Sequence, residues 1–127
     1  MEIKVGDYVR IKWGNGLQTI SQCKNIVDMG DTQYAKDDFY IHTDKSGEVI
    51  YKTMIVKSSP NIIDLIEVGD YVNGKKVIDT YTDYIFDYSE EFKVVRFSET
   101  DILHNVNHIK SIVTKEQFEQ MQYKVGE

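Results

Sequence analysis

Short apolar runs separated by polar turns extend along most of the chain, which predicts a fold built mainly of β-strands. Asn73-Gly74 lies between two such runs and is a strong hairpin signal, because both residues tolerate positive φ. Residues 28–38 are polar and rich in Asp, so we expect a loop there. The strands that we expect cover residues 3–13, 17–27, 39–43, 48–56, 66–72, 76–84, 85–88, 92–97 and 109–113, with turns at 14–16, 44–47 and 89–91.

One heptad occurs twice in the chain. Residues 3–9 read IKVGDYV and residues 66–72 read IEVGDYV, so the copies differ only at their second position. The Gly-Asp pair suits a bend or bulge where the chain enters a sheet, and the following Tyr-Val favours a strand. This opening is typical of the first strand of small SH3-like barrels, an analogy of fold and not of function.

The repeat predicts two modules. We assign residues 1–57 to an N-terminal β module, residues 58–63 to a linker and residues 64–127 to a C-terminal β module, with one helical turn near 62–66. A second helix is expected at 115–122, because Thr114 and Gln117 have the spacing of a capping box. The predicted fold class is mainly β, with two small SH3-like barrels or half-barrels and a short C-terminal helix.

Charge is distributed unevenly between the two halves. Residues 1–63 hold eight basic and eight acidic side chains, whereas residues 64–127 hold seven and thirteen, so the net charge of −6 lies in the second half. Duplex DNA is therefore not expected as a partner, since its phosphates require a basic face. No apolar stretch is long enough to cross a membrane, and the N-terminus does not resemble a signal peptide, so we expect a cytoplasmic protein.

Two segments of the second half resemble a known group of proteins. Residues 64–77 read DLIEVGDYVNGKKV and residues 109–118 read IKSIVTKEQF. They are similar to the second half of small accessory proteins encoded by phages and prophages of Gram-positive bacteria, whose first halves vary. The resemblance implies a source and no established activity. It also implies a protein that acts on a host protein or sequesters a host signal molecule.

Catalytic and metal-binding patterns are weak in this sequence. His104 and His108 have the spacing of a zinc pair, but the neighbouring asparagines favour a loop, so we expect no metal site. Cys23 has no nearby base or redox partner and is expected in a core. Asp79, Asp83 and Asp87 follow each other along a predicted strand, where we expect them to stay ionised on an exposed face. We therefore expect no enzyme and no cofactor.

Two groups of aromatic and charged residues are candidate binding surfaces. An aromatic ring beside a cation can hold a nucleobase and its phosphate, although the same rings could fill a small core. An acidic, aromatic segment suits a basic patch on a protein, or is a solvated face. The candidate ligand-binding residues are Arg10, Lys12, Trp13, Tyr34 and Tyr40, and the candidate protein-binding residues are Asp83, Tyr84, Asp87, Tyr88, Glu90 and Glu91.

These features predict a non-enzymatic phage accessory protein that binds and inhibits a host factor, in counter-defence, through an acidic and aromatic surface. One alternative is a pocket that sequesters a nucleotide immune signal. A second is a structural or assembly protein whose barrels mediate self-association, so a homo-oligomer is possible. A weaker alternative is single-stranded nucleic-acid binding by the first module.

Overall fold

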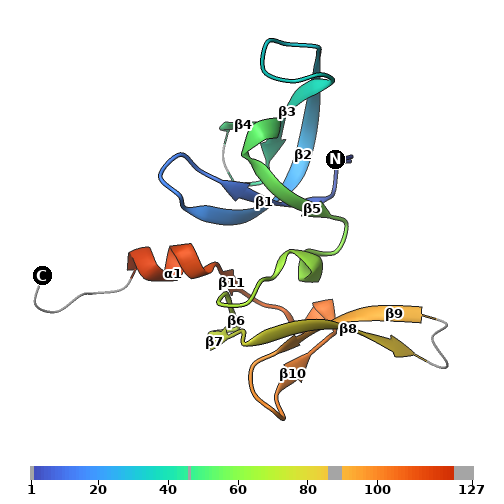
Figure 1. Cartoon of the computed structure of the whole chain (residues 1–127), viewed down its shortest axis with the longest axis vertical. Coiled ribbons are helices and arrows are strands. Elements are labelled where there is room, and N and C mark those ends of the chain that lie inside the picture. The colour runs from blue at the N-terminus through green and yellow to red at the C-terminus, as the bar shows by residue number, and fades with distance from the viewer. Residues whose placement is uncertain (1, 46, 86–89, 122–127) are drawn as a thin grey trace, which may run out of the picture. The chain divides into compact units, whose positions relative to one another are not determined.

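The computed structural model describes residues 2–45, 47–85 and 90–121 and divides the chain into two compact units (Figure 1). Unit 1 spans Met1–Asn61 and unit 2 spans Ile62–Glu127. The fold is mainly β with one short C-terminal α-helix, which confirms the predicted fold class. No helix in these three ranges has the length and apolar character needed to cross a membrane.

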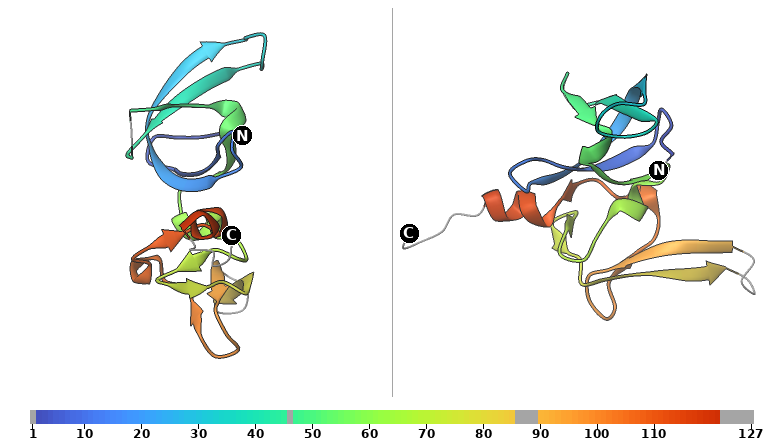
Figure 2. Two further views of the ribbon diagram at one scale, coloured as in Figure 1. Left: turned by 90° about the vertical axis from the view of Figure 1, so that its left-hand side faces the viewer. Right: turned by 45° about the horizontal axis from the view of Figure 1, so that its top comes forward.

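Unit 1 forms one bent antiparallel sheet. The strand order is β4-β3-β2-β1-β5, and the long strand β2 bends so that it pairs with β1 at its start and with β3 at its end (Figure 2). Its elements are β1 (Tyr8–Lys12), β2 (Gln18–Gly30), β3 (Asp38–Thr43), β4 (Val49–Tyr51), the 3-10 turn η1 (Lys52–Met54) and β5 (Ile55–Ser59). Because β4 and β5 are opposite edges of this sheet, unit 1 is an SH3-like half-barrel and not a closed barrel.

Unit 2 repeats this order of elements in two smaller sheets, β11-β6-β7 and β10-β9-β8. The strands β7 and β8 together correspond to β2. Residues 77–78 interrupt them, whereas β2 is continuous. The 3-10 turn before the last strand also recurs. The elements are η2 (Ile62–Leu65), β6 (Tyr71–Val72), β7 (Lys75–Lys76), β8 (Asp79–Ile85), β9 (Glu90–Arg96), β10 (Ile102–Leu103), η3 (Val106–His108), β11 (Ile112–Val113) and α1 (Lys115–Met121).

The repeated heptad folds in the same way in both units. The Gly6 N–H donates to the Cys23 carbonyl and the Gly69 N–H to the Val77 carbonyl, each at 2.9 Å. In return, Cys23 N–H donates to Asp7 O at 2.7 Å and Val77 N–H to Asp70 O at 2.8 Å. The two glycines have φ of 99° and 97°, which only glycine adopts at little cost. The Gly-Asp pair is thus a tight turn that leads each chain segment into its first strand, as predicted.

The equivalence extends to the two cores. Val9 and Val72, both fully buried, follow the turn in each copy. Ile41 pairs with Ile50 across β3 and β4, as Val95 pairs with Leu103 across β9 and β10. Each of these side chains belongs to the core of its own unit. The sequence repeat therefore marks a repeat of topology and core, although identity outside the heptad is low.

Helix α1 begins with the predicted capping box. The Gln117 N–H donates to Thr114 Oγ1 at 3.2 Å, and the Thr114 N–H donates to Gln117 Oε1 at 3.0 Å. Asp70 adds a second cap, because its Oδ1 accepts the Lys115 N–H at 3.0 Å. The helix also packs through Phe118, whose ring stacks on Tyr71 with 4.0 Å between centroids. Residue 122, the last of the predicted helix, lies outside the described residues.

Several predicted boundaries were wrong. The expected strand 48–56 is two strands joined by η1, and the expected strand 76–84 is interrupted at residues 77–78. The predicted linker 58–63 contains the boundary between the units at residues 61 and 62, but residues 58 and 59 belong to β5 and residues 62 and 63 to η2. The predicted loop 28–38 is shorter, since β2 and β3 continue pairing as far as Gly30 and Asp38. Strand β10 and turn η3 were not predicted.

Candidate protein-binding surface

Strands β8 and β9 form a hairpin that projects beyond the rest of unit 2 (Figures 1 and 2). Asp79 pairs with Arg96 at its base, and Ile85 pairs with Glu90 at its outer end. The predicted turn at 89–91 was wrong, because Glu90 and Glu91 belong to β9 and pair with β8. The expected strand began at Phe92, whereas cross-strand pairing extends β9 to the two charged residues before it.

The base of the hairpin is fixed to the rest of its unit. Val95 belongs to the core, and Lys93 Nζ donates to the Asp64 carbonyl at 3.3 Å. On the other face, the Arg96 guanidinium lies 5.1 Å from the centroid of Tyr81. A side-chain hydrogen bond to Tyr81 raises the pKa of Arg96, so this cation stays charged. Phe92 packs on His104 with 5.2 Å between ring centroids, which holds the middle of β9.

The outer end of the hairpin is acidic and exposed. Asp83, Glu90 and Glu91 are exposed; Glu91 lies directly opposite Tyr84, which is 47% exposed, on one face of the hairpin, whereas Asp83 and Glu90 belong to the other face. Asp83 Oδ1 accepts the Tyr84 N–H at 2.8 Å, which fixes the backbone between the two side chains. Residues 77–92 contain five acidic residues and no Lys or Arg. The structure thus brings four of the six predicted protein-binding residues together, while Asp87 and Tyr88 lie outside the described residues.

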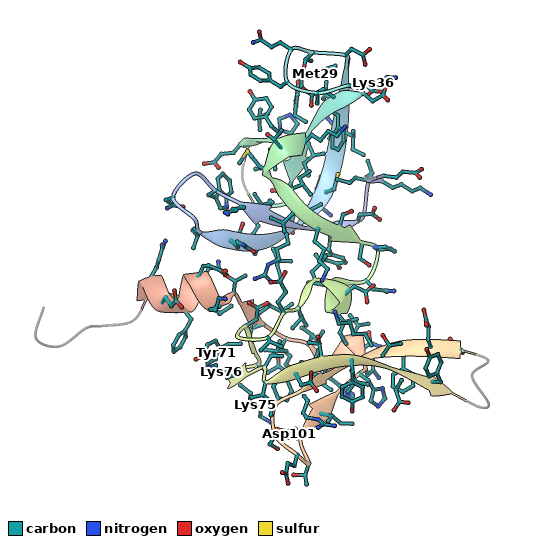
Figure 3. All side chains as sticks on the ribbon, viewed as in Figure 1. Met29, Lys36, Tyr71, Lys75, Lys76 and Asp101 are labelled. Carbon is teal, nitrogen blue, oxygen red and sulfur yellow. The ribbon has the colours of Figure 1, made fainter. Side chains whose placement is uncertain are left out.

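Basic side chains of unit 2 lie away from this end. Lys75 of β7, labelled with Asp101 in Figure 3, forms an ion pair with Asp101 at 2.8 Å and lies over the ring of Phe97. Lys93, the first basic residue after the acidic segment, contacts η2 through the Asp64 carbonyl. Within the described residues, the outer end of the hairpin therefore has an uncompensated negative charge, which attracts a cationic surface.

The predicted ligand-binding residues do not form one site. Arg10 is only 1% exposed, and its Nε donates to Gln18 Oε1 at 2.7 Å. Lys12 is exposed, whereas Trp13 packs against the core and donates through Nε1 to Thr19 Oγ1 at 2.9 Å. These three residues lie near the start of β2.

Tyr34 and Tyr40 belong to the other end of β2. Tyr34 lies in the β2–β3 connection, and Tyr40 on β3 packs edge-on against Tyr51, with 6.2 Å between centroids. Trp13 thus belongs to the start of β2 and Tyr34 to the connection after its end, where the Thr32 hydroxyl bonds to Asp38 of β3. Tyr51 was missed, since its position opposite Tyr40 depends on a cross-strand register that the sequence does not reveal.

Cys23 is a buried core residue, as predicted. Its thiol is 0% exposed and contacts the Asn25 carbonyl with 3.7 Å between sulfur and oxygen. Burial raises the pKa of the Cys23 thiol, and the charge of Asp7 adds to this effect, while the contact with Asn25 opposes it. A thiolate is therefore disfavoured in the folded state.

The raised pKa of Cys23 predicts a loss of stability at alkaline pH. The unfolded thiol ionises near its ordinary pKa of about 8.5, whereas the folded thiol keeps its proton to higher pH. The free energy of unfolding should therefore be constant with respect to this group below that pH and decrease above it. Urea denaturation from pH 7 to 10 should show this decrease in the wild type and a smaller one in Cys23→Val, which has the residue of the equivalent position 77. Equal slopes would contradict the assignment.

The two histidines of the sequence pair have different surroundings in the structure. His104 packs on Phe92, and His108 lies in η3. Among the described residues, no group of three or more His, Cys, Asp or Glu side chains has the arrangement of a metal centre. Comparison of the chain with protein-family models, with curated proteins and with solved structures gives no significant match.

Proposed function

We propose that this chain is a non-enzymatic binding protein that inserts or docks the outer end of the β8–β9 hairpin on a basic surface of a partner protein. The observation that carries the proposal is the exposure of three carboxylates, Asp83, Glu90 and Glu91, and of Tyr84 at the outer end of a projecting hairpin. Carboxylates steer a cationic partner and fix its orientation. A tyrosine among them can bury a large ring while its hydroxyl stays hydrogen-bonded.

The resemblance to phage and prophage accessory proteins suggests what the partner is. Under that interpretation it is a host protein with a basic, functional surface, such as a nucleic-acid channel, which the hairpin blocks. The acidic hairpin then acts as an inhibitor by occupying the site of a polyanion. Nucleotide capture by the first unit has less support, because Arg10 and Trp13 are engaged within the fold and lie apart from Tyr34.

Affinity capture with matched charge variants tests the proposal. The tagged protein and two triple variants are incubated with a lysate of a Gram-positive bacterium. The hairpin variant carries Asp83→Asn, Glu90→Gln and Glu91→Gln, and the control carries Glu2→Gln, Asp28→Asn and Glu119→Gln. Both change the net charge by the same amount at exposed carboxylates.

We expect a specific protein to be retained by the wild type and the control and lost by the hairpin variant. Its retention should also decrease when the salt concentration rises from about 0.1 M to about 0.5 M, because exposed charges are screened over a shorter distance. A partner that the hairpin variant retains as well as the wild type would contradict the proposal.

A further inference from the structure

A pocket of about 570 Å³ lies at the end of the β2–β3 hairpin in unit 1. Residues that line it come from β2, the β2–β3 connection, β3, β4 and η1 and include Met29, Thr32, Tyr34, Asp38, Tyr51 and Thr53. Figure 3 labels Met29 at this end of the hairpin. We propose that this pocket binds the guanidinium group of an arginine side chain of a partner protein. The site is in unit 1, so the proposal does not depend on the function proposed for the β8–β9 hairpin.

Two exposed tyrosines provide the aromatic part of the pocket. Tyr34 is 78% exposed in the β2–β3 connection, and Tyr51 is 51% exposed on the edge strand β4. Tyr51 is supported from the side by Tyr40, whose ring in turn meets His42 edge-on at 5.6 Å between centroids. Exposed aromatic rings of this kind attract a planar cation through the negative face of the ring.

The loop that carries Tyr34 is held in place before any ligand binds. The Thr32 hydroxyl donates to Asp38 Oδ2 at 2.7 Å and accepts the Tyr34 N–H at 3.1 Å. The Thr32 N–H donates to the Ala35 carbonyl at 2.9 Å, and the Asp37 N–H donates to Asp31 Oδ1, also at 2.9 Å. Because these hydrogen bonds already order the loop, little conformational entropy is lost when a ligand binds.

The charge of the pocket favours a cation. Asp38 is only 5% exposed, and besides the Thr32 hydroxyl it accepts the Phe39 N–H at 2.9 Å. A carboxylate has about four acceptor positions, so both oxygens can accept further hydrogen bonds. Asp38 is the one charged residue among the described residues that line the pocket, and the nearby Lys36 and Lys52 do not line it. A phosphate would be repelled here, whereas a guanidinium can stack on tyrosine and donate to the carboxylate.

The pocket lies at the end of a hairpin that has an equivalent in unit 2. The β2–β3 and β8–β9 hairpins are equivalent in the two units, and both have ends that are acidic and carry exposed tyrosine. An arginine pocket on one hairpin and an acidic end on the other are each suited to a basic partner. Two such contacts increase the overall affinity when both can form together.

The test uses two short peptides and the full-length protein. The probes are acetyl-Gly-Gly-Arg-Gly-Gly-amide and its citrulline analogue, which has nearly the same shape but no charge. Each is titrated into ¹⁵N-labelled protein, and amide shifts are followed by NMR. We expect saturable shifts at residues 29–34, 38 and 51–53 with the arginine peptide. The citrulline peptide should bind about tenfold more weakly or worse, which corresponds to the loss of roughly 1.4 kcal/mol.

Variants separate this pocket from general attraction to acidic surface. Tyr51→Ala and Tyr34→Ala should each reduce the affinity for the arginine peptide about fivefold or more, while Tyr84→Ala in unit 2 leaves it unchanged. The dispersion of each spectrum shows that the variant is folded. Equal binding of both peptides, shifts confined to residues 79–92, no shift at about 20 mM peptide, or stronger shifts of the same amides with adenosine monophosphate would each overturn the proposal.

Discussion

Replacing Asp70 with alanine is expected to lower the free energy of unfolding by about 3 kcal/mol or more. The Asp70 side chain is 0% exposed and accepts two backbone N–H groups, from Glu67 at 2.9 Å and from Lys115 at 3.0 Å. The first bond closes the turn of the second heptad, and the second bond caps α1. Alanine would leave both donors, which are partly buried, without this acceptor, and it would remove a negative charge from the N-terminus of the helix. Urea denaturation followed by circular dichroism measures the loss.

The first heptad contains the matched control. Asp7 accepts the Lys4 N–H at 2.9 Å in the same turn, but it is half-buried and has no helix to cap. Asp7→Ala should therefore cost about 1 kcal/mol, within the range for losing one cap-like hydrogen bond. Asp70→Asn should fall between the two, since an amide oxygen can replace one of the two acceptors. Equal losses for Asp7→Ala and Asp70→Ala would show that the link to α1 contributes little.

Replacing Tyr84 with alanine should weaken binding of the captured partner by about tenfold to a hundredfold. Tyr84 is a large, exposed aromatic side chain directly opposite the exposed carboxylate Glu91, and such residues carry a large share of the binding energy when an interface forms. The loss should appear in the dissociation rate, whereas neutralising Glu90 and Glu91 should mainly slow association. Surface plasmon resonance with the purified partner separates the two rates.

A conservative variant serves as the control for Tyr84. Tyr84→Phe keeps the ring and should stay within about threefold of the wild-type affinity if burial of the ring dominates. Because Tyr84 is on the projecting part of the hairpin, neither substitution should change the free energy of unfolding by more than about 0.5 kcal/mol. Binding that is unaffected by Tyr84→Ala would place the partner elsewhere on the molecule.

The repeated heptad made the fold class predictable from the sequence. Its Gly-Asp pair encodes a local turn with positive φ, and local geometry of this kind can be inferred from residue type. The Thr114–Gln117 capping box is local in the same sense, and the structure has both of its hydrogen bonds. The role of Asp70 at the start of α1 was not predicted, because its partner Lys115 is 45 residues away in the chain.

Interruptions in the strands were the least predictable part of the fold. The apolar pattern at 48–56 continues through η1, so it does not show that three of these residues form a 3-10 turn. Strand β10 has two residues and is formed by pairing with β9, which no local preference requires.

The sequence identified a candidate site best where the residues of that site are close together in the chain. Asp83, Tyr84, Glu90 and Glu91 are close in sequence, and antiparallel pairing keeps them close in space. Arg10, Trp13 and Tyr34 could meet only if the loop 31–37 folded toward the β1–β2 turn. Instead, the bonds of Thr32 and Asp38 hold that loop on β3. Side-chain character identified the tyrosines, but only the sheet register showed that Tyr40 meets Tyr51 and not Trp13.

Site-specific photo-crosslinking tests most directly whether the β8–β9 hairpin is the partner-binding surface. A benzophenone amino acid replaces Tyr84 in one protein and the exposed turn residue Val5 in the other, and both are irradiated in cells that contain the partner. We expect a crosslink from position 84 to a Lys- or Arg-rich segment of one protein, and none from position 5. Crosslinks from position 5 alone, or from both positions to many proteins equally, would contradict the proposed function.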